Sequence, residues 1–493
     1  MKLRDLLPDV PIRETHGNLD ADILAVVADS RLAVRGSLFV AIPGLQHDGA
    51  GFIPSAIEKG AVAVVAQTLL SARPQTGVSV AHIEVDDPRA ALALIAANFY
   101  GHPADKLSLV GVTGTSGKTT TTKMLESIFD ATGEPAGLIG TIEYRAGDAR
   151  LMADRTTPDA VILQQWFAKM VEKRVQHAVM EVSSHALALK RTYGIHFAAA
   201  VFTNLSQDHF DFHKDFEDYY AAKRTLFDQI ESANRAVINI DDAYGRRLIQ
   251  ELGPKPMTFG ERGDIRPAKG FEISTRGLRG TLHSPSGDIR VDSALLGRPN
   301  LYNWMAAAGA GIVLGMKDRQ IEAGIRNLHL VRGRFEVVES DGGPTVIVDY
   351  AHKPDALEKL LHAVRDLAGK KRVVVLFGCG GDRDRDKRPK MGKIATELAD
   401  FTILTSDNPR SEKPDAIIDD IERGARTGSG KYVRITDRRD AIARAIDAAS
   451  DDDVIVIAGK GHESYQVIGD QVIHFDDREE AELVLKKRHE KTA

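Results

Sequence analysis

Short apolar runs alternate with longer segments of helical spacing along nearly the whole chain. The runs are rich in valine, isoleucine and alanine, and polar or glycine-rich turns follow most of them. This alternation is typical of α/β folds, in which helices cover a mostly parallel sheet. We therefore predict an α/β protein. The predicted strands are residues 37–42, 61–65, 82–85, 107–112, 177–182, 197–202, 235–240, 345–349, 372–377, 401–404 and 454–458, and the predicted helices are 51–59, 88–100, 119–129, 219–227 and 300–314.

Two breaks in this pattern divide the chain. His102-Pro103 ends the first segment, and Val331-Arg-Gly-Arg-Phe335 is a poor interior for any element, because a glycine separates two arginines. A length of 493 residues suits about three domains of usual size. We predict a small α/β domain at 1–103, a central domain at 104–335 with a doubly wound, mostly parallel sheet, and a Rossmann-like α/β domain at 336–493.

The strand at 107–112 leads into the loop Thr113-Gly-Thr-Ser-Gly-Lys-Thr119 and then into a helix. This arrangement cradles phosphate groups, because backbone N–H groups and the helix dipole face the anion. Lys118 would reach the outer phosphates of a nucleotide, and the Thr119 hydroxyl would bind Mg²⁺. The spacing departs from the common P-loop, since Val112 stands where a glycine is expected. A glycine turn without a ligand is the alternative; we predict ATP binding.

Composition narrows the class of protein. A formal net charge of −5 argues against a nucleic-acid partner held by bulk electrostatics. The single cysteine, Cys379, excludes an intramolecular disulfide and fits a reducing compartment. The N-terminus lacks an apolar signal-peptide core, and the apolar run at 305–316 is too short to span a bilayer. We expect a cytoplasmic protein without a membrane span.

Polar residues follow the strands of the central domain, where ligands of doubly wound sheets collect. Glu181 lies in an apolar strand and needs a partner there, either Mg²⁺ or a buried salt bridge. Alternation would place His209, Asp211 and His213 on one strand face as a Zn²⁺ site, but a polar loop beside a magnesium nucleotide is favoured. Lys223 interrupts the apolar face of a helix, for which a surface lysine with a buried stem is the common explanation.

Other polar segments lie in the outer domains. The simpler interpretation of Asp29-Ser-Arg31 is a surface ion pair, and that of residues 43–49 is a solvated turn. By themselves these two segments do not indicate a binding site. Four strands of the third domain end in polar or glycine-rich segments, at 349–354, 378–384, 406–410 and 459–463. Because the ends of parallel strands meet at one edge, these segments predict a binding surface, with plain tight turns as the alternative.

Together these segments resemble the Mur ligases of peptidoglycan synthesis, ATP-dependent ligases that add amino acids to a UDP-linked muramoyl peptide. The resemblance covers essentially the whole chain, and the family's phosphate loop matches residues 113–119, which accounts for Val112. The other matching segments are Glu181-Val-Ser-Ser-His185, Asn204-Leu-Ser-Gln-Asp-His209, Asn300 with Asn303, and Asp349-Tyr-Ala-His-Lys-Pro354.

Within the family, Asp407-Asn-Pro-Arg410 is similar to the segment of members that add meso-diaminopimelate to UDP-N-acetylmuramoyl-L-alanyl-D-glutamate. Meso-diaminopimelate carries one carboxylate more than lysine, and a guanidinium offers a planar fork to a carboxylate. Asp407 and Glu463 would hold the ammonium group. The site that the resemblance implies for this amino acid comprises Arg383, Asp407, Asn408, Pro409, Arg410, Gly459 and Glu463.

The resemblance also implies ATP as co-substrate, Mg²⁺ and an acyl-phosphate intermediate on the D-glutamyl γ-carboxylate. Lys223 matches a lysine that relatives carry as a carbamate. The implied roles are catalysis for Lys118, Lys223 and His209; metal binding for Thr119, Glu181, His209 and Lys223; nucleotide binding for Gly114, Thr115, Ser116, Gly117, Lys118, Thr119, Thr120, Asn300, Arg334, Asp349 and His352; and contact with the UDP-muramoyl peptide for Ser30, Gln46, Thr156, Thr157, Ser183, Arg191 and Lys223.

We expect a monomer. Three alternative functions stay open at this stage. One is a lysine-adding Mur ligase, and another is a different amide ligase of the superfamily, such as folylpolyglutamate synthase. The segment Asp407–Arg410 argues against both. The third is a P-loop switch or transport ATPase, which leaves the polar strand ends of the third domain unexplained.

Overall fold

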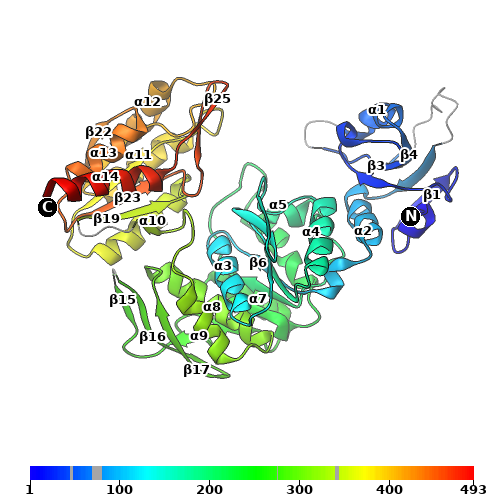
Figure 1. Ribbon diagram of the computed structural model, residues 1–493, viewed down its shortest axis with the longest axis horizontal. Coiled ribbons are helices and arrows are strands. Elements are labelled where there is room, and N and C mark those ends of the chain that lie inside the picture. Colours follow the sequence, from blue (N-terminus) through cyan, green and yellow to red (C-terminus); the bar gives the residue numbers. More distant parts are fainter. Residues whose placement is uncertain (45–47, 69–79, 275, 339–342, 493) are drawn as a thin grey trace. The chain divides into compact units, whose positions relative to one another are not determined.

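The computed structural model describes residues 1–44, 48–68, 80–274, 276–338 and 343–492. Three sheets of mostly parallel strands, flanked by helices, confirm the predicted α/β class (Figure 1). The chain divides into two compact units. The first comprises Met1–Leu205, His209–Phe259 and Ala306–Gln320, and the second comprises Ser206–Asp208, Gly260–Met305 and Ile321–Ala493.

The N-terminal sheet has the strand order β1-β5-β4-β3-β2, and only the pair β1 and β5 is antiparallel. Its helix α2 has the bounds that the sequence predicts, because the Asp87 carboxylate accepts from the first backbone N–H groups and Gly101, in a left-handed conformation, ends the helix. The elements are η1 Leu3–Leu6, β1 Ile12–His16, β2 Ala25–Val27, η2 Ser30–Leu32, β3 Ser37–Val40, η3 Gly49–Phe52, α1 Ile53–Glu58, β4 Ala61–Ala66, β5 Ala81–Val85, α2 Pro88–Tyr100 and η4 Pro103–Lys106.

The central sheet has the order β13-β12-β11-β6-β10-β7-β8-β9, in which only the β7–β8 and β8–β9 pairs are antiparallel. Strand β6 (Ser108–Thr113) lies between β10 and β11, so the chain order reverses there, and ligands of such sheets bind at this switch point. The other elements are α3 Lys118–Asp130, β7 Ala136–Ile139, β8 Glu143–Ala146, β9 Ala149–Met152, α4 Ala160–Glu172, β10 His177–Glu181, α5 Ser184–Ala188, β11 Ala199–Phe202, α6 Phe216–Arg224, η5 Thr225–Asp228, η6 Ala233–Arg235, β12 Ala236–Asn239, α7 Ala243–Leu252 and β13 Met257–Phe259.

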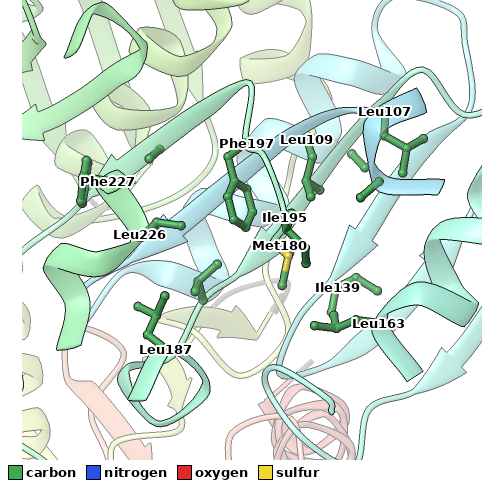
Figure 2. Packing of buried hydrophobic residues seen from close by; sticks show 14 of the residues in the cluster. Leu107, Leu109, Ile139, Leu163, Met180, Leu187, Ile195, Phe197, Leu226 and Phe227 are labelled. Atoms are coloured by element: carbon green, nitrogen blue, oxygen red, sulfur yellow. The ribbon is translucent and has the colours of Figure 1, made fainter. Parts of the chain in front are cut away.

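A large apolar cluster holds this sheet and its helices together. Figure 2 shows part of it, with Leu109 of β6, Met180 of β10 and Phe197 among the labelled side chains. Gly111 of β6 allows close packing, because a Cβ atom at this position would lie 2.9 Å from Leu226 and 3.0 Å from Phe197. Burial of this apolar surface fixes the strand that precedes the phosphate loop.

The C-terminal sheet has the order β18-β19-β23-β20-β21-β22, parallel except for β18. Its elements are β18 Glu336–Val338, β19 Thr345–Asp349, α10 Pro354–Ala368, β20 Val373–Phe377, α11 Lys387–Leu398, β21 Phe401–Leu404, α12 Pro414–Ala425, β22 Lys431–Arg434, α13 Arg438–Asp447, β23 Val454–Ala458 and α14 Asp477–Thr492, with a hairpin of β24 Tyr465–Ile468 and β25 Gln471–His474.

A smaller antiparallel sheet forms within residues 266–293. It consists of β14 Arg266–Pro267, β15 Glu272–Ser274, β16 Gly277–Ser284 and β17 Gly287–Ser293, and it is followed in the chain by α8 Arg298–Val313 and α9 Asp318–Asn327. Residues 305–313 of the apolar segment 305–316 form the later part of α8, where Met305, Ala306 and Ala307 are fully buried. No helix in the described ranges is long and apolar enough to cross a membrane.

Candidate active site

The phosphate loop joins β6 to α3, and two of its glycines are required by the backbone. Gly114 has φ +144°, and a Cβ atom there would lie 1.9 Å from the Thr203 hydroxyl oxygen. Gly117, with φ +87°, stands at the N-cap of α3. Both backbone conformations are ones that other residues rarely adopt. The glycines of the motif are therefore explained by local geometry, and Val112 is the last apolar position of the buried strand.

Asn204, at the end of β11, fixes the same loop. Its backbone oxygen accepts a hydrogen bond of 2.8 Å from Thr115 N–H, and its side-chain oxygen accepts one of 3.0 Å from Ser116 N–H. Its side-chain amide also donates to the Ser116 carbonyl at 3.1 Å. Three hydrogen bonds from one residue hold the loop against the neighbouring strand.

Two lysines converge on one carbonyl of the loop. Lys118 Nζ donates to the Gly114 oxygen at 2.9 Å and to the Thr115 oxygen at 3.0 Å. Lys223 Nζ donates to the same Gly114 oxygen at 2.9 Å. Two ammonium groups beside a helix N-terminus create a positive site of the kind that binds phosphate.

Lys223 is only 1% exposed, so the explanation of a surface lysine with a buried stem is wrong. The ammonium group lies 4.5 Å from the centre of the Tyr219 ring, and the Tyr219 hydroxyl is within 3.1 Å of the Thr115 hydroxyl. A buried lysine needs such partners, because an ammonium group loses its hydration on burial. The awkward helical position thus points the lysine at the phosphate loop.

Glu181, at the end of β10, is bound by hydroxyl and amide groups. Its carboxylate accepts from the Thr119 hydroxyl at 2.9 Å, and from Thr141 through both the backbone N–H at 2.7 Å and the hydroxyl at 3.1 Å. Among the described residues, no lysine or arginine forms an ion pair with it. The salt-bridge alternative is therefore wrong for Glu181. Thr141 carries no motif that sequence reasoning could use, since it reaches the site through the turn between β7 and β8.

Residues 208–213 form turns and not a strand. The Phe212 and His213 N–H groups donate to the His209 carbonyl at 3.0 and 2.8 Å, and His209 has a left-handed φ of +57°. The His209 ring lies 4.7 Å from the His185 ring and 6.2 Å from the Tyr219 ring. No group of three or more His, Cys, Asp or Glu side chains suited to a metal occurs in the part of the chain that the structure describes. The strand-face arrangement considered for Zn²⁺ does not form.

The residues predicted to contact the muramoyl peptide adjoin Glu181. Thr157 donates from its hydroxyl to the Glu181 carbonyl at 2.8 Å and accepts from Ser183 N–H at 3.1 Å. The Arg191 guanidinium donates to the Thr157 carbonyl at 2.6 Å, and burial lowers the pKa of Arg191. Thr156 shares a hydrogen bond of 3.1 Å with Thr141. These four predicted residues therefore surround one strand end.

Ser30 and Gln46, which are also predicted to contact the UDP-muramoyl peptide, belong to the N-terminal segment of the chain. Ser30 is buried at the start of η2, and its carbonyl accepts from Lys59 Nζ at 3.1 Å. Arg31 pairs with Asp29 at the surface, as the simpler interpretation expects. Gln46 lies outside the described residues.

In the second unit, Asp349 ends β19 beside a group of rings and cations. Its carboxylate accepts from the Phe335 and Ala351 N–H groups, each at 2.8 Å, and burial raises its pKa despite the nearby Arg334. The Tyr350 ring lies 4.9 Å from the Arg334 guanidinium and 4.5 Å from the His352 ring. Three of the predicted nucleotide-binding residues, Arg334, Asp349 and His352, thus lie together.

Two histidines of this group, His352 and His462, give the protein an expected pH response. Burial, assisted by Lys387 at His352 and by Arg334 at His462, lowers the pKa of each to about 4. Both stay neutral in the folded state while they protonate in the unfolded state below about pH 6.5. We therefore expect their contribution to the free energy of unfolding to be complete above about pH 6.5 and to fall as the pH approaches 4.

Chemical denaturation of the wild type and a His462→Gln variant across this range measures the effect. Burial raises the pKa of Glu463, whose contribution runs in the opposite direction, so the difference between the two proteins isolates the histidine. A smaller change in the free energy of unfolding with pH in the variant than in the wild type agrees with the expectation. An equal change in the two proteins contradicts it.

The predicted amino-acid site gathers at the ends of β21 and β23. Asn408 donates from its amide nitrogen to Glu463 at 2.9 Å, and Lys460, fully buried, donates to the Asn408 side-chain oxygen at 3.2 Å and to Glu463 at 3.3 Å. Gly459 has φ +117°, and a Cβ atom there would lie 2.9 Å from Asp407. Lys460 was within a segment that the sequence marks as polar, but no pattern gives it a role.

Arg410 and Arg383 lie on the two loops beside this cluster. Arg410 donates to the Gly381 carbonyl at 2.8 Å, and its backbone is left-handed with φ +51°. Arg383 donates to the Asp382 carbonyl at 3.1 Å. Pro409 lies between Asn408 and Arg410, with its carbonyl against Gly381. All seven residues predicted for the amino acid therefore share one edge of the C-terminal sheet.

Asn300 lies in α8 and is buried, with its amide donating to the Leu296 carbonyl at 2.8 Å. Its side-chain oxygen accepts from Asn303 at 3.1 Å. Its predicted contact with the nucleotide stays a prediction.

A buried ion pair lies next to the strand ends that carry the predicted amino-acid site. Arg438 and Asp477 are fully buried and form two hydrogen bonds of 2.7 Å, while Arg438 also donates to the Ser406 carbonyl at 3.3 Å and the Ala458 carbonyl at 3.0 Å. These two carbonyls immediately precede Asp407 and Gly459 in the chain. Arg438 therefore ties together the two strand ends that carry the site.

We expect Asp477→Asn to lower the free energy of unfolding by about 3 kcal/mol or more, because removing one partner leaves a buried guanidinium without its counter-charge. Urea denaturation measures the change. Asp451→Asn is the matched control, since Asp451 is exposed and pairs with Arg488 at the surface, where the loss is expected to stay below about 1 kcal/mol. Equal losses in the two variants contradict the expectation.

Comparison with known proteins agrees with this geometry. Three family models match the chain: "Mur ligase family, catalytic domain" at residues 22–100, "Mur ligase middle domain" at 112–311, and "Mur ligase, glutamate ligase domain" at 333–461. With relatives that match from end to end, these models show that the chain belongs to the Mur ligase family.

Two curated relatives are both named UDP-N-acetylmuramoyl-L-alanyl-D-glutamate–2,6-diaminopimelate ligase. The protein of Clostridium acetobutylicum, numbered 1 in its name, is 42% identical and covers 99% of this chain and 100% of its own. That of Gloeobacter violaceus is 46% identical and covers 99% of each chain. A solved structure of an enzyme with the same name superposes with a TM-score of 0.70, at 31% identity and 99% coverage of both chains.

Proposed function

We propose that this Mur ligase uses ATP to join meso-diaminopimelate to the D-glutamyl γ-carboxylate of UDP-N-acetylmuramoyl-L-alanyl-D-glutamate. The full-length relatives named for this reaction support the proposal. The observation that carries the choice of amino acid is the sheet edge where Arg410 and Arg383 lie beside the Asn408–Glu463 pair. Guanidinium groups suit the second carboxylate of diaminopimelate, which lysine lacks.

The first step is phosphoryl transfer from ATP to the D-glutamyl carboxylate, which gives an acyl phosphate and ADP. Catalysis of this step depends mainly on positioning and on neutralisation of charge. The phosphate loop provides the cradle, with Lys118 as the cation that binds and orients the phosphates, and Lys223 lies against the same loop. Thr115, Ser116 and Thr120 belong to the same loop and helix start. Arg334, Asp349, His352 and Asn300 of the second unit stay predicted nucleotide-binding residues.

Mg²⁺ fits the pair of Thr119 and Glu181, because a hydroxyl and a carboxylate oxygen 2.9 Å apart are ligands of the type that this ion prefers. When bound, Mg²⁺ would neutralise charge on the phosphates. His209, whose ring faces His185 at the same edge of the sheet, is the further candidate ligand. Lys223 joins the ligand set if it carries a carbamate, which converts a cation into an anion.

In the second step the amine of diaminopimelate attacks the acyl phosphate and phosphate leaves. Asn408, Glu463 and Asp407 hold the ammonium end, while Arg410 and Arg383 bind the far carboxylate. Thr156, Thr157, Ser183 and Arg191 align the muramoyl peptide at the end of β10, and Ser30 and Gln46 contact the UDP moiety. The proposal includes the cytoplasmic location and monomeric state expected from the sequence.

One assay tests the proposal. Purified protein is incubated with ATP, Mg²⁺ and the UDP-muramoyl dipeptide, with either diaminopimelate or lysine, and ADP and UDP-muramoyl tripeptide are quantified. We expect tripeptide with diaminopimelate and little with lysine. A preference for lysine would assign the lysine-adding activity instead, and ATP hydrolysis that is independent of any amino acid would favour a P-loop ATPase.

A further inference from the structure

Two loops of the C-terminal sheet are joined along their length, and together they carry both arginines of the amino-acid site. Residues 378–385 follow β20, and residues 406–412 follow β21. Gly381 N–H donates to the Asn408 carbonyl at 2.9 Å, and Arg410 donates back to the Gly381 carbonyl at 2.8 Å. A Cβ atom on Gly381 would lie 1.8 Å from the Pro409 carbonyl oxygen. The loops are thus in direct backbone contact.

Glu412 stands at the end of the second loop and binds the first through both carboxylate oxygens. One oxygen accepts from Asp382 N–H at 2.7 Å and from Arg388 at 2.8 Å. The other accepts from Arg385 and from Arg388, each at 3.0 Å. Four donors match the full accepting capacity of a carboxylate. The Arg388 guanidinium is foremost among the groups that lower the pKa of Glu412 to about 2, so the side chain is ionised throughout the working range.

Arg388 is the rigid part of this arrangement. It lies in the first turn of α11, its side chain is fully buried, and it forms a second ion pair of 2.9 Å with Asp420 of α12. It also donates to the Gly380 carbonyl at 3.3 Å. A buried guanidinium bonded to two carboxylates on separate segments fixes their spacing, because its donors are held in a planar fork.

The residues between Glu412 and the two arginines have constrained backbones. Asp382 and Arg410 both have left-handed φ angles, of +54° and +51°. Such conformations persist in non-glycine residues only when surrounding contacts hold them. The Asp382 carboxylate accepts hydrogen bonds from the Ser411 hydroxyl at 2.6 Å and from the Ser411 backbone N–H at 3.2 Å. The Asp382 backbone N–H itself donates to Glu412. Asp382 directly precedes Arg383, and Ser411 directly follows Arg410. These contacts therefore fix the backbone positions from which the Arg383 and Arg410 side chains extend.

We propose that Glu412, held by Arg388, is a positioning residue that fixes the distance between Arg383 and Arg410 and thereby the preference for a second carboxylate on the amino acid. The inference rests on the proposed function, because it concerns the same amino-acid site. Glu412 touches no substrate in this proposal; it acts through the loops that carry the two guanidinium groups. The same contacts explain why a residue with no reactive role is so completely hydrogen-bonded.

The test compares Glu412→Gln with the wild type in the tripeptide assay. Glutamine keeps the size of the side chain and an acceptor for Asp382 N–H, but it leaves Arg388 and Arg385 without its charge. We expect the KM for diaminopimelate to rise about tenfold, the magnitude of one lost charge-assisted hydrogen bond, with the KM values for ATP and the UDP-muramoyl dipeptide unchanged. The ratio of kcat/KM for diaminopimelate to that for lysine should fall by a similar factor.

Glu422→Gln is the matched control. Glu422 is also buried and binds two arginines, Arg426 at 2.9 Å and Arg434 at 3.2 Å, but it contacts neither loop. The Glu422→Gln variant should be less stable than the wild type, but its ratio of kcat/KM for diaminopimelate to kcat/KM for lysine should stay unchanged. If Glu412→Gln does not fold, Ser411→Ala provides the second variant, because it removes only the exposed hydroxyl that binds Asp382; its ratio should fall in the same direction by a smaller factor.

The outcomes separate the inference from the proposed function. Wild-type protein that makes no tripeptide with diaminopimelate overturns the proposed function. Wild-type activity together with an unchanged amino-acid ratio in Glu412→Gln, or in Ser411→Ala where the first variant is unfolded, overturns the positioning role alone. Equal loss of kcat/KM for both amino acids also overturns it, since that result describes a structural role only.

Discussion

Lys223→Ala is expected to lower ligase turnover by about a hundredfold or more, the magnitude typical of removing one preorganised electrostatic group. The side chain is buried, and its ammonium nitrogen lies 2.9 Å from the Gly114 carbonyl of the phosphate loop. Added bicarbonate should not restore activity, because no amine remains to form a carbamate. Tripeptide formation and ADP release measure the effect.

Two companion variants make this expectation specific to Lys223. Lys223→Met fills the space of the buried stem without the charge and should lose as much activity as the alanine variant, which excludes a cavity as the cause. Lys173→Ala removes an exposed lysine that pairs with Asp148 and should retain wild-type turnover. Near-normal turnover in Lys223→Ala would remove this lysine from the catalytic machinery.

Arg410→Ala is expected to lower kcat/KM for diaminopimelate by about a hundredfold, while the KM for ATP stays unchanged. The reason is the loss of a planar, two-donor partner for a carboxylate in a site lined by buried polar groups. Arg410→Lys should lose nearly as much, because an ammonium group cannot form the fork. Turnover with lysine, which has no second carboxylate, should change little in either variant.

Competition between the two amino acids in one reaction gives the clearest measurement. The wild type should yield mainly the diaminopimelate tripeptide, and the Arg410 variants should yield a mixture. Arg426→Ala is the control, since this exposed arginine binds Glu422 through its side chain and contacts neither loop of the site. An unchanged product ratio in Arg410→Ala would assign recognition of the far carboxylate elsewhere, with Arg383 as the first candidate.

Local sequence patterns predicted much of the fold. The helix at 88–100 has its observed bounds because an aspartate cap and a terminal glycine mark its two ends in the sequence. The phosphate loop was found for the same reason, since strand, glycines and helix follow each other without interruption. The polar ends of β19, β20, β21 and β23 meet at one edge, as expected for parallel strands.

Contacts between distant segments could not be predicted in the same way. Thr141 binds Glu181 across forty positions of the sequence, and nothing in its neighbourhood signals this. The burial of Lys223 depends on packing of α6 against the phosphate loop, whereas helical spacing alone suggested a surface position. Glu412 and Arg388 are ordinary charged residues in the sequence, and only the folded loops show that they are partners. The two boundaries between the three domains remain predictions.

The hold of Asn204 on the phosphate loop has a consequence for the thermodynamics of nucleotide binding. The backbone N–H groups of Thr115 and Ser116 already donate to Asn204. The backbone N–H donors for a phosphate must therefore come from Gly117 and the first turn of α3. A loop fixed in this way loses little conformational entropy when a ligand arrives, and more of the interaction energy appears as affinity. Nucleotide binding should therefore leave the Thr115 and Ser116 amides equally protected from hydrogen exchange, before and after saturation.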